Sequence, residues 1–506
     1  MAGTSETINA SDESSPLVIA APAEQRPAVS GLSPTNLNAV FPGTDQERHS
    51  FHCFRTRVTT QLSGYFDEWF WKRTVLQAAH QETIIRHAIL ALGSLVERVE
   101  HEDHSEAISL SSPSEGVFAL QHYNHAIREL KLSAQRRQLS LDVLLITCLL
   151  FASFEVVRRH HGSAVSHIGS GIKVLSEYQD SAEAPQLLQK HAIGSVPYID
   201  LQRLEVLFGT LNSHARHLGP FPRMTIRNLY PEDAENISCT FPPAFSSLDE
   251  AHASFQYIFN KCVYEWQDIR DRGPTPQLVA EHRAQLRQFD QWQSSMRAFL
   301  RNLGKSLSLT TLRVARVLQL NLDMLALQLE VGTELDSSGR LKWETPIPEI
   351  EGLRPIAWDS HIPRFQKLIS LARVIVDHAV TCHAAKTDRL RNFALDTNVV
   401  PALYFVATSC RDPIIRRDAV ALLYALPPEE GLWPSAIVAR ICERVVKIEE
   451  EGLGQVNCCE DVPEHARIQW TRVSFDVEGQ PSKISYQKGR IPGRDVRDDY
   501  FEYLQW

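Results

Sequence analysis

The stretch Val399–Ser435, VVPALYFVATSCRDPIIRRDAVALLYALPPEEGLWPS, decides the fold because it predicts two helices separated by one sharp turn. The first helix is the apolar run Val399–Cys410. At the break, Asp412 can cap the second helix with its carboxylate, and Pro413 suits the first helical position, where its missing N–H is not needed. The turn therefore has a physical cause in its own residues.

The second helix of this stretch has an apolar face and a charged side. Its apolar residues recur every three or four positions, whereas Arg416, Arg417 and Asp418 fall off that face. The arginine pair is interpreted as a solvated helix surface. Pro427-Pro428 ends the helix. Because a hairpin this apolar must be covered by other helices, the stretch predicts an all-α domain.

Similar helical patterns cover most of the chain, and its 506 residues exceed the roughly 250–300 at which one hydrophobic core stops growing. We therefore expect two packed lobes. Residues 219–247, with five prolines, are the best boundary. The predicted division is a disordered arm at 1–48, helical lobe 1 at 49–218, a linker at 219–247, helical lobe 2 at 248–455 and a tail at 456–506.

The two ends of the chain differ from its helical body. The arm is rich in Ser, Thr, Ala, Pro and Glu, which cannot bury enough apolar surface to offset the entropy of ordering. In the tail, Arg467–Val477 and Lys483–Gln487 alternate around Gly479-Gln480-Pro481, which predicts a short β hairpin. No fixed-period repeat indicates a solenoid.

Composition narrows the function classes. The net charge is −9 and the basic residues come as isolated pairs, which does not favour a surface that grips phosphate backbones by itself. None of the nine cysteines forms a C-x-x-C pair, and an odd number without a framework suits a reducing compartment. The longest apolar run, Val143–Phe154, is shorter than the roughly 20 residues that span a bilayer, so we expect no membrane partner.

Five stretches, taken in their order along the chain, resemble one family: Thr83–Leu95, Tyr123–Ile127, His167–Leu175, Cys410–Arg417 and Glu430–Trp433. The resemblance implies the all-helical regulatory region of fungal zinc-cluster transcription factors and covers most of residues 51–475. That family normally carries a six-cysteine zinc cluster near its N-terminus, whereas here no cysteine precedes Cys53. Only the regulatory half of the family's function therefore carries over.

Histidine pairs are candidates for a metal site, because histidines three residues apart on a helix can share a ligand. His122 and His125 have this spacing, and so do His214 and His217. No third ligand can be assigned to either pair, so we interpret both as surface or helix-end histidines.

Four other patterns do not fit the chemistry they suggest. His101 and His104 fall in an acidic loop and His160-His161 at a helix junction, and neither set makes H-E-x-x-H. Gly169-Ser170-Gly171 follows no strand, so close helix packing explains it better than a phosphate loop. Asp498–Glu502 resembles a magnesium motif of helical terpene cyclases but has no second cluster opposite it.

The sequence therefore predicts a nuclear transcriptional regulator of a fungal metabolic or biosynthetic gene set, with no catalytic, cofactor-binding, metal or DNA-binding residues assigned. Its expected partners are other transcription factors or co-regulators, including a homodimer or heterodimer, with DNA reached indirectly and a small-molecule effector in an inter-helical pocket. Two alternatives stay open. One is a truncated gene model of a full zinc-cluster factor, and the other is a helical enzyme of a metabolic pathway.

Overall fold

The structure is a computed structural model, and the predicted disordered arm falls mostly outside the residues it describes. Helix α1, Asp45–Cys53, begins inside residues 1–48. Phe41 stacks on Phe51 at a ring-centroid distance of 4.0 Å, so order begins before the position predicted from sequence. The described residues are 41–63, 68–104, 113–136, 139–180, 201–215, 232–233, 238–239, 241–272, 276–333, 355–384, 399–426, 434–474, 482–488 and 499–504.

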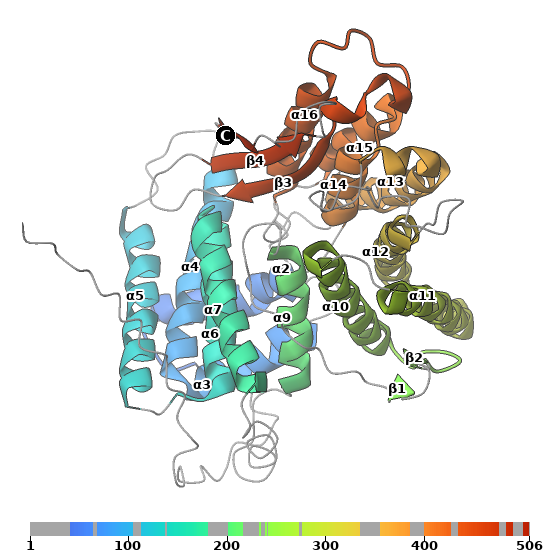
Figure 1. The fold of residues 1–506 in the computed structure, drawn as a ribbon. Helices are drawn as coiled ribbons and strands as arrows, with labels where there is room; N and C mark the ends of the chain where they lie inside the picture. Colours follow the sequence, from blue (N-terminus) through green and yellow to red (C-terminus); the bar gives the residue numbers. More distant parts are fainter. Residues whose placement is uncertain are drawn as a thin grey trace, which may run out of the picture.

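The first half of the chain is a helical bundle in which α4, α5, α6 and α7 run side by side (Figure 1). Helix α4 packs against α5 and α6, α7 packs against α6 and α9, and α9 packs against α10. Two π-helical turns, η2 (Phe54–Val58) and η3 (Phe70–Thr74), connect the first short helices. The remaining helices are α2 (Thr59–Ser63), α3 (Val75–Gln81), α4 (Thr83–His104), α5 (Pro113–Gln135), α6 (Leu141–Val157), α7 (His161–Asp180) and α9 (Leu201–Ala215).

Helix α6 is the central helix of this bundle, as its nearly uniform apolar character predicts. All of its residues except Asp142 are buried. Its buried hydroxyl groups are satisfied within the helix, since Thr147 donates to the Val143 carbonyl at 2.7 Å and Ser153 to the Leu149 carbonyl at 2.8 Å. The polar residues of α6 therefore do not interrupt the core.

The second half contains α10 to α16, and it confirms the helix–turn–helix predicted from the opening stretch. Asp412 caps α15, and its Oδ1 accepts the backbone N–H groups of Ile414 and Ile415 at 3.0 and 2.9 Å. Pro413 is the first residue of that helix. The helices are α10 (Leu248–Arg272), α11 (Pro276–Leu303), α12 (Leu309–Thr333), α13 (Ile362–Ala384), α14 (Val400–Ser409), α15 (Pro413–Ala425) and α16 (Ser435–Glu450).

The all-α fold class is confirmed, and one connected hydrophobic core runs from Phe41 to Cys442. This core includes residues of both predicted lobes, and the division at 219–247 stays a prediction. Within that segment the structure describes β1, Glu232–Asp233, which pairs antiparallel with β2, Ser238–Cys239. Short 3-10 turns complete the described helical segments, at Gly304–Ser306, Pro355–His361, Cys459–Asp461 and Glu464–Ala466.

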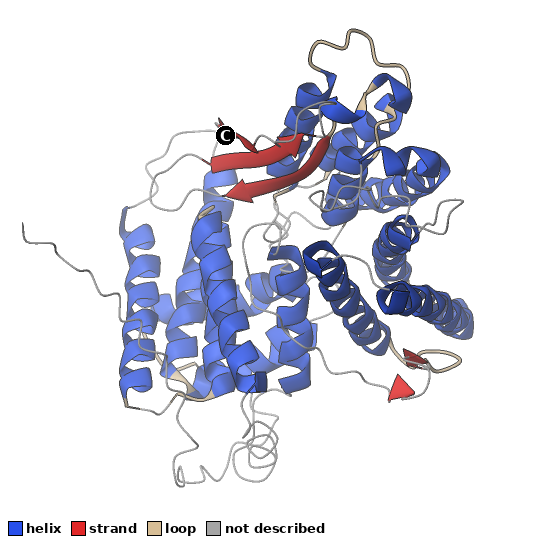
Figure 2. Cartoon of the chain, viewed as in Figure 1, coloured by secondary structure: helices blue, strands red, loops and turns tan. Residues whose placement is uncertain are grey.

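The predicted β hairpin near the C-terminus is confirmed, but the sequence analysis missed a third strand. Strand β3 (Ile468–Ser474) pairs antiparallel with β4 (Ser482–Lys488), which pairs with β5 (Asp499–Leu504), and Figure 2 shows this sheet beside the helices. A second, smaller apolar cluster attaches the sheet to α16. It consists of Ile441, Val445, Ile448, Ile468, Ile484 and Tyr486.

A buried ionic network also joins α15, α16 and the sheet, which corrects the solvated reading of Arg416. The guanidinium groups of Arg411 and Arg416 each lie 2.7 Å from the carboxylate of Glu449, and all three side chains are buried. The N–H of Ile468 donates to Glu449 at 2.7 Å, and its carbonyl accepts from Arg411 at 2.9 Å. Arg417 stays half-exposed and pairs with Glu450. Arg416 is therefore buried although it lies off the apolar face of its helix, because its guanidinium pairs with Glu449.

Burial acts to raise the pKa of the Glu449 carboxyl group, but the two guanidinium groups outweigh it and hold this pKa below its ordinary value. Glu449 is therefore charged at neutral pH. A second pair extends the network, because the Arg467 guanidinium binds both carboxylate oxygens of Asp359 at 2.7 Å. Together these pairs fix the start of β3 against the helices.

Candidate functional site

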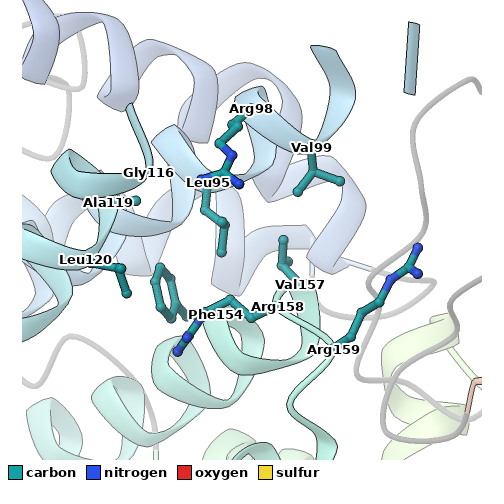
Figure 3. A pocket seen from close by; sticks show the side chains of 10 residues that line it. All are labelled: Leu95, Arg98, Val99, Gly116, Ala119, Leu120, Phe154, Val157, Arg158 and Arg159. Atoms are coloured by element: carbon teal, nitrogen blue, oxygen red, sulfur yellow. The ribbon is translucent and has the colours of Figure 1, made fainter. Parts of the chain in front are cut away.

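A cavity with a volume of about 490 Å³ lies between α4, α5 and α6 (Figure 3). This size falls in the range of small-molecule sites, roughly 300–1,000 Å³. Its lining combines apolar side chains with three arginines and includes no acidic residue among the described residues. The lining residues are Leu95, Arg98, Val99, Gly116, Ala119, Leu120, Phe154, Val157, Arg158 and Arg159.

The arginines of the cavity come from two helices. Arg98 lies on α4, and Gly116 on α5 leaves the space that its guanidinium fills, because a Cβ at position 116 would lie 2.1 Å from Arg98 Nη1. Arg158 is the C-cap of α6 and pairs with the buried Glu155, with Nη1–Oε distances of 3.2 and 3.3 Å. Arg158-Arg159 therefore ends a helix at the cavity, with Arg158 partly buried and Arg159 exposed.

Arg159 has a left-handed backbone, with φ of 63°, and it is the one non-glycine residue with positive φ in the described part of the chain. It ends α6 in a Schellman motif. Its N–H donates to the Val156 carbonyl at 2.9 Å, and the His160 N–H donates to the Glu155 carbonyl at 2.8 Å. Glycine is usual at this position because side chains disfavour left-handed geometry.

The pair His122 and His125 has a neighbour on α4 that sequence reasoning did not find. His87 Nδ1 lies 2.8 Å from His122 Nδ1, and its ring lies 5.3 Å from that of His125. His122 Nε2 lies 3.9 Å from Glu47. His122 is buried, in contrast to the surface position predicted from sequence, whereas His125 is exposed as predicted.

The electrostatics of this cluster favour neutral imidazoles. Burial, followed by the neighbouring His87, lowers the pKa of His122 to about 4. Burial, followed by His125, also lowers the pKa of His87. The short His87–His122 contact joins the two Nδ1 atoms to each other. No group of three or more His, Cys, Asp or Glu side chains is placed to hold a metal ion among the residues that the structure describes.

The other histidine candidates lie on α4, on α9 and at the junction before α7. His101 and His104 lie in the last turn of α4 and not in a loop. His214 belongs to α9, and its predicted partner His217 lies outside the described residues. His160 Nδ1 lies 3.2 Å from Glu155 Oε2, at the junction before α7 that the sequence predicts.

Two remaining candidates have structural explanations. A Cβ on Gly171 would lie 2.3 Å from the Phe208 ring, so this glycine lets α7 and α9 approach closely, as predicted. Residues 499–502 of the tested magnesium motif form part of strand β5. Its Glu502 accepts from Arg444 Nε at 2.6 Å and Nη2 at 2.8 Å, and it therefore serves as an ion-pair partner within the fold.

Most cysteines of the described residues are buried. Seven of them are free thiols in the described residues, and Cys148 and Cys410 lie in the core. Burial raises the pKa of each of these two thiols to about 12. In the vicinal pair Cys458 is exposed and Cys459 is buried. No helix in the described ranges is long and apolar enough to cross a bilayer.

The described part of the chain is a many-helix body with a cavity of about 490 Å³ between α4, α5 and α6. Residues 50–230 match the family described as "Fungal specific transcription factor domain". Residues 50–230 therefore match this domain, and the family resemblance seen in the sequence is confirmed over this part of the chain. With this domain the protein is a transcriptional regulator. No solved structure matches the chain.

Two curated relatives agree with this assignment. One is the "Aspercryptin biosynthesis cluster-specific transcription regulator atnN" of Emericella nidulans, which is 24% identical over 90% of this chain and 83% of its own length. The other is the "Transcription regulator lscL" of Purpureocillium lilacinum, which is 30% identical over 30% of this chain and 35% of its own length.

Proposed function

We propose that this regulator controls a fungal biosynthetic gene set and acts in the nucleus. The observation that carries the proposal is the similarity to a cluster-specific regulator along 90% of the chain, with the matched transcription-factor domain inside it. That domain corresponds to the bundle from α1 to α9. The proposal assigns contact and control to the helical body and no catalytic step.

The regulator would reach DNA through a partner. The chain carries a net charge of −9, contains no C-x-x-C pair and has no cysteine in residues 1–52, so this sequence offers neither a zinc-cluster reader nor a surplus of cations for phosphate contacts. The partner is another transcription factor, a co-regulator or a second copy of the chain. A small effector would adjust this assembly by binding in the cavity between α4, α5 and α6.

Deletion of the gene tests the regulatory role. In the deletion strain we expect a coordinated change in the transcripts of one set of neighbouring biosynthetic genes, which re-expression of the full chain reverses. Transcript levels across the genome, measured in the parent, deletion and complemented strains, give the answer. An unchanged transcriptome under conditions that activate the parent's biosynthetic genes would contradict the proposal.

A gel-shift experiment tests the indirect contact with DNA. The promoters of the affected genes should not be shifted by the purified chain, but they should be shifted once a co-purified zinc-cluster factor is added. A sequence-specific shift by the chain alone would refute indirect binding. Sequencing the 5′ end of the transcript addresses the truncation alternative, because an in-frame exon with six cysteines would establish a full zinc-cluster factor.

A further inference from the structure

We propose that the cavity between α4, α5 and α6 binds a small anionic amphiphile, a molecule with an apolar body and one carboxylate, sulfonate or phosphate group. This inference rests on the proposed function for its biological meaning, since it names the chemical class of the effector. Its physical basis is the lining of the cavity, in which apolar side chains lie beside arginines. One of these arginines, Arg159, has a left-handed backbone that is costly for a residue with a side chain.

The floor of the cavity suits an apolar body. In Figure 3, Leu95 of α4 and Val157 of α6 point toward the middle of the cavity, with Phe154 below them. On α5, Leu120 lines the cavity and is 41% exposed. A ligand that covers these side chains would remove apolar surface from water, which favours binding.

The charge of the lining selects an anion. In Figure 3 the Arg98 side chain lies beside Leu95, and the exposed Arg159 side chain extends outward from the end of α6. The lining includes no carboxylate among the described residues. Arg98 and Arg159 each also interact with other groups of the chain. Because a guanidinium has five N–H donors, it can serve such a partner and a bound anion together. Arginine is also suited to two-pronged contact with carboxylate and phosphate oxygens.

Two backbone features indicate that these arginines are held where they are at a cost to helix stability. Arg159 occupies the left-handed position that glycine adopts without strain. Gly116 lies within α5, where glycine is a poor helix former, and it leaves the space for the Arg98 guanidinium. Local stability would favour a glycine at the first of these positions and an alanine at the second, whereas the chain has neither.

These two features supply variants that should lose the ligand without losing the fold. Arg159→Gly removes the charge and relieves the backbone, and Gly116→Ala displaces the end of the flexible Arg98 side chain while favouring the helix. Both variants should be at least as resistant to urea as the parent. Arg373→Gln is the matched control, because Arg373 is a half-exposed arginine on α13, paired with Asp418 and remote in sequence from the cavity.

The binding experiment uses the purified full chain and the fluorescent sulfonate 1-anilinonaphthalene-8-sulfonate, with decanoate and decanol as competitors. We expect decanoate to displace the dye at least tenfold more effectively than decanol. Arg159→Gly and Gly116→Ala should each weaken decanoate binding about tenfold and leave decanol unchanged, and Arg373→Gln should behave like the parent. A tenfold change corresponds to about 1.4 kcal/mol.

Three results would overturn the inference: no saturable dye binding, equal displacement by decanoate and decanol, or full decanoate affinity in both cavity variants. Repeating the titration with decyl phosphate distinguishes a carboxylate site from a phosphate site. The measurement does not depend on transcription. If the chain does not bind decanoate but the deletion strain shows the expected change in transcripts, only the effector class is refuted. If the chain binds decanoate but the deletion leaves the transcripts unchanged, only the proposed function is refuted.

Discussion

Replacing Glu449 by glutamine removes the one anion that lies between two buried guanidinium groups. Its carboxylate is 2.7 Å from Arg411 and 2.7 Å from Arg416, and it also accepts the N–H of Ile468 at 2.7 Å. The glutamine oxygen can keep one of these contacts. Its NH₂ group must then face a second set of donors, so at least one guanidinium stays buried without an anionic partner.

Breaking a buried ion pair on one side costs about 3–5 kcal/mol, because an uncompensated charge stays in a medium of low dielectric constant. We therefore expect Glu449→Gln to lower the free energy of unfolding by that amount, a large part of the roughly 5–15 kcal/mol typical of native proteins. Arg416→Met should cost less. It leaves Glu449 paired with Arg411, and Arg416 Nε and Nη1 have no hydrogen-bond partner within the described residues.

Urea unfolding of the full chain, followed by circular dichroism, measures these differences. The control is Asp418→Asn on α15, which removes an exposed pair with Arg373 and should cost less than about 1 kcal/mol. A loss below about 1 kcal/mol for Glu449→Gln would refute the reasoning, because it would mean that water already solvates the network.

The same network predicts a dependence on pH. The pKa of Glu449 is depressed in the folded protein, so its contribution is fully present above the pKa of an unfolded glutamate, about 4.3, and is lost as pH falls through the folded-state value. Glu449→Gln lacks this group. The stability difference between parent and variant should therefore shrink as the buffer is made more acidic than about pH 4, which unfolding curves at successive pH values would show.

Three further perturbations follow from the bundle. The pKa of His122 is about 4 when folded and about 6.5 when unfolded, so stability falls as pH drops between these values. The parent should lose about 2 kcal/mol more than His122→Gln between about pH 7.5 and 5 in urea titrations, and equal losses would contradict the neutral, buried imidazole. Gly93→Ala places a Cβ 2.2 Å from the Ser50 carbonyl oxygen and should cost about 1–3 kcal/mol, seen as a lower urea midpoint; an unchanged midpoint would show that the helices separate freely. Gly171→Ala meets the Phe208 ring at 2.3 Å and should be rescued in part by Phe208→Leu, which a double-mutant cycle would measure, and strict additivity would contradict the contact.

Sequence periodicity predicted the helices well because their stabilising contacts are apolar and regular. Helix α6 and the turn at Asp412-Pro413 need only local information, namely a buried apolar run, a capping carboxylate and a proline at the first helical position. Arg416 shows where this reasoning stops. Its burial depends on Glu449, 33 residues away, and no local pattern indicates that a distant carboxylate will neutralise it.

The candidate site was even less accessible to sequence reasoning. The cavity brings together Arg98 of α4 and Arg159 of the turn after α6, and His87 of α4 meets His122 of α5 in the same way. Such meetings are set by tertiary packing. One signal was present, because an arginine pair directly follows the apolar run of α6 and thus marks the end of a helix. Strand β5 was missed because it lies alone, with no second alternating segment beside it in the sequence.

The attachment of Ile468 to Glu449 and Arg411 has a consequence for how the protein is made. The helices α14 to α16 are synthesised before strand β3. Until Ile468 is added, Arg411 and Glu449 therefore lack the backbone carbonyl and N–H to which they bind in the folded protein. Since chains generally fold from the N-terminus during synthesis, this part of the molecule must stay unfinished until the ribosome has passed residue 468. In a nascent chain stalled before residue 468, this unfinished part of the molecule would be accessible to chaperones and proteases.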